Sequence, residues 1–329
     1  MSLAKGPDGR PGFNPWGMSL QVPDSDQFPA GSAVCRFSHQ AMATVFEIFC
    51  VHPDPAYARQ AAWRAFDLVD RLEQDLSRFI ENSDISRVNS LADGESARVS
   101  RWTMECLLLS QLAHTETLGA FDISLGTGLD GIELSPHDFM VRARAHAIRL
   151  DFGGIGKGYA LDRMAEVLIE WDIHQALIHG GFSSVLAMDA PSCWDGWPLT
   201  MSVPTEGQGE TFALLHARRR VLSASGLRKG DHILNPKGGQ PCRLRAAAWV
   251  AADVNALTPF CRKTRRVGAS DTPVSESPAA VAEVFSTAFM ILGLSEVEDC
   301  CRRYSGLESW LIEQGAKDPG GTLDVIHLP

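Results

Sequence analysis

The chain has 329 residues, a length that suggests about two domains or one large one. Hydrophobic residues make up 45% and charged residues 21%, a globular composition that can bury a core without disulfide or metal staples. Forty acidic residues against thirty basic ones leave a formal net charge of -10, which argues against a nucleic-acid partner bound by a basic surface. Apolar runs such as 246–252 are far shorter than the roughly 20 residues of a membrane helix, so no membrane span is predicted.

The first part of the chain differs in composition from the rest. Residues 1–33 are rich in Gly, Pro, Ser and Asp and lack hydrophobic periodicity, which predicts a flexible leader before a single domain over residues 34–329. The leader has neither an apolar signal-peptide core nor a lipobox-like cysteine. We therefore expect a cytoplasmic location, or a periplasmic or lipid-anchored one if a targeting segment has been removed. The eight cysteines show no CxxC spacing and are expected to be reduced, mostly buried thiols.

The remaining chain mixes helical and extended patterns. Residues 44–51 are rich in β-formers and predict a strand, and apolar residues recur at helical spacing over 55–76. Helices and strands do not alternate regularly, so the expected fold class is α+β rather than doubly wound. In the first half of the chain we further expect a helix at about 103–117, a loop at 121–131, a hairpin at 139–150 and a glycine-rich turn at 153–158 that opens a helix. Strands are expected at 176–178, 184–188, 212–215, 221–226 and 245–252, with a turn and loop at 232–239. The chain then continues with an irregular insertion at 261–277, a helix from Ser277 and Pro278 to a stop at Gly293, and strands near Trp310 and Val325.

The glycine-rich turn carries the densest chemical signal. Asp151 follows a predicted strand end, and the glycines of 153–158 lead into a helix. Glycines let the backbone approach a ligand closely, and the free N–H groups at a helix N-terminus favour a phosphate. Lys157 would add a positive charge to that phosphate. The alternative is a structural turn with a surface lysine.

Two familiar nucleotide motifs are excluded. A P-loop requires Gly six residues before its Lys and Ser or Thr after it, whereas this chain has Asp151 and Gly158 at those positions. Residues 126–131 match the spacing GxGxxG, but they follow no clear strand and open no helix. We therefore do not predict a Rossmann dinucleotide site.

A second signal lies on the helix predicted after Ser277. Glu283 and Thr287 are four residues apart and share one helix face, with Ser286 adjacent. A carboxylate and a hydroxyl suit a hard cation such as Mg²⁺, which usually also takes carbonyl, phosphate and water oxygens. The alternative is an ordinary solvated helix surface.

A third signal is the segment 231–241. Its Asn-Pro and Gly-Gly pairs are typical of turns, and His232 could hydrogen-bond a ligand. The alternative for His232 is a purely structural histidine, and His39 and His179 are interpreted in that way.

These three segments occur in an order that resembles the ApbE family, the FAD:protein FMN transferases. Residues 151–162, Asp-Phe-Gly-Gly-Ile-Gly-Lys-Gly-Tyr-Ala-Leu-Asp, match the central family motif nearly residue for residue. The resemblance covers about residues 35–327. Five further segments are similar to family motifs, namely 42–44, 76–79 with 83–89, 120–124, 231–239 and 282–288.

The resemblance implies a fold, an activity and two bound species. The fold would be an α+β, T-fold-related arrangement of mixed sheets and packed helices in two interleaved subdomains, with residues 34–329 as one catalytic domain. The activity would be Mg²⁺-dependent transfer of FMN from FAD to a threonine hydroxyl of an acceptor flavoprotein, with release of AMP. Mg²⁺ is then the expected cofactor, and FAD and the acceptor flavoprotein are the expected partners.

The resemblance also implies roles for individual residues. Met42 and Phe79 would pack against the flavin nucleotide. The Gly154 carbonyl, Glu283 and Thr287 would ligate Mg²⁺, which makes Glu283 and Thr287 the expected catalytic residues. The rest of FAD would be held by Ala120, Phe121, Asp122, Asp151, Lys157 and His232.

The chain departs from the family pattern at three positions. Glu283 stands where the family usually has Asp, Asn235 replaces an Asp before proline, and Phe182 replaces the Asp of a Gly-Gly-Asp turn. Two alternatives stay open. One is an FAD pyrophosphatase that forms FMN and AMP, as the resemblance implies for some family members, and the other is a non-catalytic FAD-binding protein, to which these departures point. The chain has no acceptor-type threonine motif, so we do not expect it to flavinylate itself.

Overall fold

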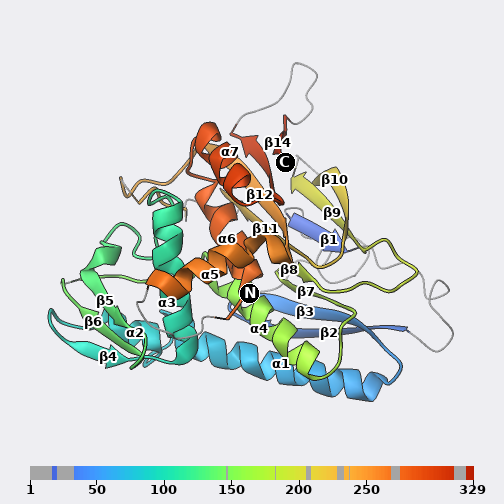
Figure 1. The fold of residues 1–329 in the computed structure, drawn as a ribbon, viewed down its shortest axis with the longest axis horizontal. Coiled ribbons are helices and arrows are strands. Elements are labelled where there is room, and N and C mark those ends of the chain that lie inside the picture. The colour runs from blue at the N-terminus through green and yellow to red at the C-terminus, as the bar shows by residue number, and fades with distance from the viewer. Residues whose placement is uncertain are drawn as a thin grey trace.

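The computed structural model describes residues 17–20, 33–145, 147–181, 183–204, 209–227, 233–236, 238–267, 275–314 and 324–329. Its centre is an eight-stranded antiparallel sheet (Figure 1), and the predicted α+β class is confirmed. Across the sheet the strands are β14 (Ile326–Leu328), β13 (Leu307–Glu313), β12 (Arg245–Asp253), β11 (Arg220–Gly226), β8 (Ser184–Ala187), β7 (Ala176–Gly180), β3 (Thr44–His52) and β2 (Ala33–Ala41).

Three helices cover one face of this sheet, namely α1 (Pro55–Leu76), α4 (Gly156–Glu170) and α6 (Pro278–Ala288) (Figure 1). Successive strand residues point to opposite faces, so Phe46 and Ile48 are buried beneath the helices while Phe49 belongs to the core on the other side. The start of α1 is locally encoded: the Asp54 carboxylate accepts hydrogen bonds from the Ala56 and Tyr57 amides. The observed helix has the predicted bounds because both its apolar spacing and its cap lie within the segment.

A small sheet covers the opposite face. It contains β1 (Gly17–Leu20), β9 (Trp197–Pro204) and β10 (Gly209–Ala217), and Trp197 and Leu199 fill a second core with Trp249 of β12. Strand β1 lies within the predicted leader and pairs antiparallel with β9. The partner strand β9 is about half the chain length away in the sequence, and local hydrophobic periodicity does not predict a pairing over that separation.

A third unit completes the fold at the left of Figure 1. It contains α2 (Asp84–Asn89), α3 (Arg101–Glu116) and a sheet of β4 (Ser96–Arg98), β6 (Met140–Ala143) and β5 (Ile132–Ser135). The bounds of the hairpin predicted at 139–150 are wrong, since the observed hairpin is formed by β5 and β6 and ends at Ala143. Short 3-10 helices occur at Leu129–Gly131 and Val254–Leu257.

Two predictions near the end of the chain are also wrong. The insertion expected at 261–277 begins within α5 (Thr258–Val267), whose buried face includes Phe260, Cys261 and Thr264 at helical spacing. The helix expected to stop at Gly293 ends at Ala288, and Gly293 instead caps the start of α7 (Leu294–Arg303), where its N–H donates to Glu296 at 2.8 Å.

The described residues bear on two general features, the membrane-spanning potential of the helices and the state of the cysteines. In this part of the chain, no helix combines the length and apolar character that crossing a membrane requires. The expectation of mostly buried reduced thiols is confirmed by five buried free cysteines, namely Cys50, Cys106, Cys261, Cys300 and Cys301.

Candidate functional site

The predicted site residues converge on one edge of the central sheet. Met42 forms the β2–β3 turn with a positive φ of 49°. The register pairs Phe46 of β3 with Gly180 of β7, and Ser184 of β8 with both Gly180 and Ser223 of β11. The β2–β3 turn, the β7–β8 turn and the last residues of β11 therefore share one sheet edge.

The glycine-rich turn brings Gly154 against two other predicted site residues. A Cβ atom added at Gly154 would lie 3.1 Å from Cε2 of Phe121 and 3.3 Å from Oγ1 of Thr287. The turn leads into α4 at Gly156, as predicted. Segments separated by more than a hundred residues thus meet at Gly154, and only glycine leaves both neighbours in place.

Glu283 is the central carboxylate of the arrangement. It is buried on α6, and its Oε2 accepts a 2.6 Å hydrogen bond from the Gly158 amide of α4. Its Oε1 forms an ion pair with the ammonium group of Lys157. The interpretation of the Glu283 face as solvated surface is wrong, because α6 is buried between α4 and the central sheet.

Thr287 lies one turn further along α6, where it faces β11. Its Oγ1 is 3.3 Å from the Ser225 hydroxyl, and Ser225 also contacts the buried Ser286. The structure therefore places the hydroxyl of Thr287 and the carboxylate of Glu283 on α6 next to the glycine-rich turn.

Asp151 connects this turn to the exposed aromatic residue of the site. Its carboxylate accepts from the Gly153 amide at 2.7 Å and pairs with Nε of Arg78, also at 2.7 Å. The Arg78 guanidinium carbon lies 4.4 Å from the ring centroid of Phe79, whose surface is 81% exposed. Asp151 thus holds Arg78, and Arg78 covers one face of the Phe79 ring and leaves the rest of that ring available to a ligand.

The segment Ala120–Asp122 reaches the site from the end of α3. Ala120 and Phe121 are buried, while the Asp122 carboxylate accepts from the amides of Ser124 at 2.8 Å and Gly126 at 3.1 Å. The carboxylate therefore stabilises its own loop. A Cβ atom at Gly126 would lie 2.7 Å from the Pro236 carbonyl oxygen, so this loop touches the turn that contains Asn235.

Two residues singled out from the sequence cannot be placed. His232 and Phe182 lie outside the described residues. Their roles stay predictions.

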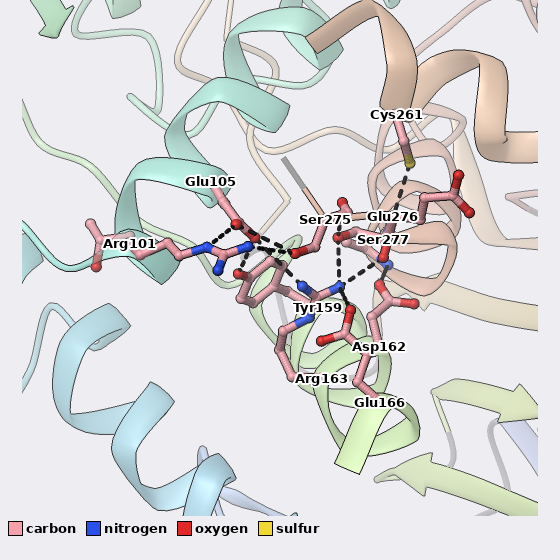
Figure 2. A network of polar contacts seen from close by, with 12 residues as sticks. Arg101, Glu105, Tyr159, Asp162, Arg163, Glu166, Cys261, Ser275, Glu276 and Ser277 are labelled. Carbon is pink, nitrogen blue, oxygen red and sulfur yellow. Dashed lines mark hydrogen bonds and ion pairs between the residues drawn. The ribbon is translucent and has the colours of Figure 1, made fainter. Parts of the chain in front are cut away.

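A buried polar network fixes α6 against α4 (Figure 2). The two Asp162 carboxylate oxygens accept from the Ala279 and Ala280 amides, each at 2.9 Å. The neighbouring Arg163 donates to the Glu276 carbonyl oxygen at 2.7 Å and pairs with Glu105 of α3 at 3.5 Å. The network holds the first turn of the helix that carries Glu283 and Thr287.

Burial gives Asp162 an unusual titration. Removal from water raises the pKa of this carboxyl from 3.8 to about 7, against the opposing effects of Arg163 and of the two amides. Other charged or titratable groups nearby are Glu166 of α4, Glu105 and Cys106 of α3, and Cys261 of α5.

The Asp162 carboxyl is therefore expected to make stability depend on pH. The unfolded chain ionises Asp162 at a lower pH than the folded one, so the stability that this group contributes falls as pH rises from about 4 to about 7. Urea unfolding of wild type and Asp162→Asn at about pH 5 and about pH 8 measures this effect. The free energy of unfolding of wild type should exceed that of Asp162→Asn by more at the lower pH than at the higher one. An equal difference in free energy of unfolding at the two pH values would contradict the raised pKa of Asp162.

Several residues of the site were not predicted from the sequence. Arg78, Ser225 and Arg163 carry no periodic or spacing signal of their own. Their roles depend on partners that are distant in the chain, such as Asp151 for Arg78. The position of Arg78 between Ser77 and Phe79 in a segment similar to a family motif is the signal that could have drawn attention to it.

The site offers oxygen donors of mixed kind. Within the described residues, no group of three or more His, Cys, Asp or Glu side chains could hold a metal. The oxygen donors around the turn are the Thr287 hydroxyl, which lies beside Gly154, and the Glu283 carboxylate, which contacts Lys157 and the Gly158 amide. Such hard donors fit Mg²⁺, which commonly takes one or two carboxylates and completes its shell with phosphate and water.

Comparisons with known proteins identify relatives of this chain. The chain is 22% identical over 260 residues to an FAD:protein FMN transferase of Klebsiella pneumoniae (strain 342), across 66% of this chain and 74% of that protein. It superposes on the flavin transferase ApbE of Vibrio cholerae with a TM-score of 0.72 at 15% identity, covering 90% of this chain and 97% of the other. The apo flavinyl transferase ApbE of Pseudomonas stutzeri gives 0.70 at 19% identity, with coverage of 90% and 94%.

The family assignment rests on a family model rather than on these distant pairs. The model of the ApbE family matches residues 42–135 and 127–258, which together make up more than half of the chain. The matched region includes Phe79, Gly154 and Lys157, and the structural neighbours share the fold. The chain belongs to the ApbE family.

Proposed function

We propose that the protein is an FAD:protein FMN transferase, which moves FMN from FAD to a threonine hydroxyl of an acceptor flavoprotein and releases AMP. The observation that carries the proposal is the meeting of Gly154, Lys157 and Glu283 with Thr287 at one sheet edge. The related protein of Klebsiella pneumoniae is named for this activity, which supports the proposal.

The residues near the turn suit a pyrophosphate. Lys157 and the amides at the start of α4 provide positive charge and hydrogen-bond donors, which favour phosphate oxygens. The Glu283 carboxylate, the Thr287 hydroxyl and the Gly154 carbonyl would hold Mg²⁺. Bound Mg²⁺ would supply charge that offsets the negative charge on the pyrophosphate as AMP leaves. The Lys157–Glu283 ion pair joins these two side chains across the α4–α6 contact.

The exposed Phe79 ring is proposed to contact the flavin nucleotide. Phe79→Ala is expected to weaken FAD binding by about 1 kcal/mol, roughly fivefold in Kd, because an aromatic contact is lost. Fluorescence titration of FAD in the absence of an acceptor measures this change. Trp63→Ala is the matched control, since Trp63 is another exposed aromatic residue, 65% exposed on α1. An equal FAD affinity in wild type and Phe79→Ala would contradict the proposed contact.

The function is tested by chromatography of nucleotides after incubation with FAD, Mg²⁺ and a flavoprotein acceptor that carries a target threonine. We expect AMP and flavinylated acceptor in equal amounts, and neither product when a chelator is present. AMP release that continues without acceptor would instead identify an FAD pyrophosphatase. Bound FAD with no AMP under any condition would identify a flavin-binding protein. The predicted cytoplasmic location is independent of this assay and stays a prediction.

A further inference from the structure

A chain of hydroxyl groups links Thr287 to the buried contact between β11 and α6. Ser223 and Ser225 are two residues apart on β11 and therefore point to the same face of the sheet, toward α6. The Ser286 hydroxyl lies 3.1 Å from that of Ser223 and 3.0 Å from that of Ser225. Ser225 is in turn 3.3 Å from Oγ1 of Thr287.

The direction of these hydrogen bonds follows from counting protons. A serine hydroxyl has one proton and two acceptor lone pairs. Ser286 donates its proton to the Glu283 carbonyl oxygen at 3.0 Å, and Ser223 donates its proton to the Ser183 carbonyl oxygen at 3.3 Å, because a carbonyl can only accept. No proton is then left for the 3.1 Å contact between Ser223 and Ser286. Ser286 therefore accepts from Ser225, whose own proton is then used. The remaining contact requires Thr287 to donate its proton to Ser225.

This order fixes the orientation of the Thr287 hydroxyl. With its proton directed to Ser225, the Thr287 oxygen retains lone pairs for another partner, and this oxygen lies beside Gly154, 3.3 Å from where a Cβ atom would stand. A cation requires lone pairs rather than a proton from such a ligand. We propose that Ser225 is a positioning residue that accepts the Thr287 proton and so keeps the Thr287 oxygen ready to ligate the cation. This inference rests on the proposed function.

The chain offers a closely matched pair of variants for testing this role. Ser225→Ala removes the acceptor of the Thr287 proton. Ser223→Ala removes a hydroxyl from the same strand and face that contacts Ser286 and the Ser183 carbonyl. Ser225→Thr keeps the hydroxyl and a strand-forming side chain, and it serves as the rescue variant.

Cation affinity provides a readout separate from turnover. Mn²⁺, which shares the preference of Mg²⁺ for oxygen ligands, is titrated into FAD-loaded protein without acceptor and followed by electron paramagnetic resonance. Ser225→Ala is expected to weaken Mn²⁺ binding roughly fivefold to tenfold, as the loss of one orienting hydrogen bond allows. Ser223→Ala and Ser225→Thr should stay within about twofold of wild type. AMP release by Ser225→Ala should fall at low Mg²⁺ and recover as Mg²⁺ is raised.

The possible outcomes separate this inference from the proposed function. If wild type releases AMP but Ser225→Ala and Ser223→Ala bind Mn²⁺ with equal affinity, the positioning role of Ser225 is overturned and the proposed function stands. A wild type that binds no Mn²⁺ and releases no AMP would overturn the proposed function, and the role of Ser225 with it.

Discussion

Glu283→Gln is expected to lower the rate of AMP release at least about a hundredfold while FAD binding largely survives. The substitution keeps the shape of the side chain and one oxygen that can accept from the Gly158 amide. It removes the negative charge that pairs with Lys157 and that a cation would require. Because the substitution removes only the charge, the Glu283→Gln protein should remain folded, which a thermal unfolding measurement checks.

Initial rates of AMP formation, measured with FAD and acceptor at several Mg²⁺ concentrations, test this prediction. Glu170→Gln is a suitable control, because Glu170 is an exposed carboxylate at the end of α4. Thr287→Ala should change the rate in the same direction. Unchanged turnover in both Glu283→Gln and Thr287→Ala would exclude the assignment of these residues to a metal site.

Gly158→Ala is expected to destabilise the fold by about 3 kcal/mol and to abolish AMP release. A Cβ atom at this position would lie 2.3 Å from the Ala279 carbonyl oxygen and 2.7 Å from the Ala280 amide nitrogen. These are backbone atoms of α6, so relief of the clash requires the two helices to separate. Separation would also break the hydrogen bond between the Gly158 amide and Glu283.

Gly156→Ala is the matched control on the same helix. A Cβ atom there would meet only Cβ of Phe152, at 4.0 Å, which is ordinary contact. Alanine is also the better helix former, by up to about 1 kcal/mol, so this variant should be as stable as wild type or more stable. Urea unfolding of both variants measures the difference. Equal stability of the two variants would show that α4 and α6 do not approach as closely as described.

The sequence predicted the elements whose signals are local. The helix at 55–76 carries its apolar periodicity and its Asp54 cap within one segment, and its observed bounds agree with the prediction. The glycine-rich turn that opens a helix was also predicted correctly, because glycine spacing is visible without knowledge of neighbours. The predicted helix from Pro278 to Gly293 was too long, since its last turn ends at Ala288.

The segment that follows this helix is held by a residue distant in the chain. The buried guanidinium group of Arg245 in β12 donates to the carbonyl oxygens of Phe289 and Leu292. These hydrogen bonds satisfy backbone carbonyl groups of the segment that follows the helix. No pattern within the helix itself reveals a partner more than forty residues away.

The candidate site likewise combines features that the sequence predicted with contacts that only the tertiary structure shows. Sequence spacing alone placed Glu283 and Thr287 on one helix face and identified the glycine-rich turn beside Lys157 as a place for a phosphate. Only the tertiary structure paired Lys157 with Glu283, Arg78 with Asp151 and Ser225 with Thr287. Helix periodicity and turn chemistry are set by neighbours along the chain, whereas these contacts depend on how α6 and α4 pack on the edge of the central sheet. The sequence by itself therefore determined which residue types and local elements are available, and the packing decided which side chains act together.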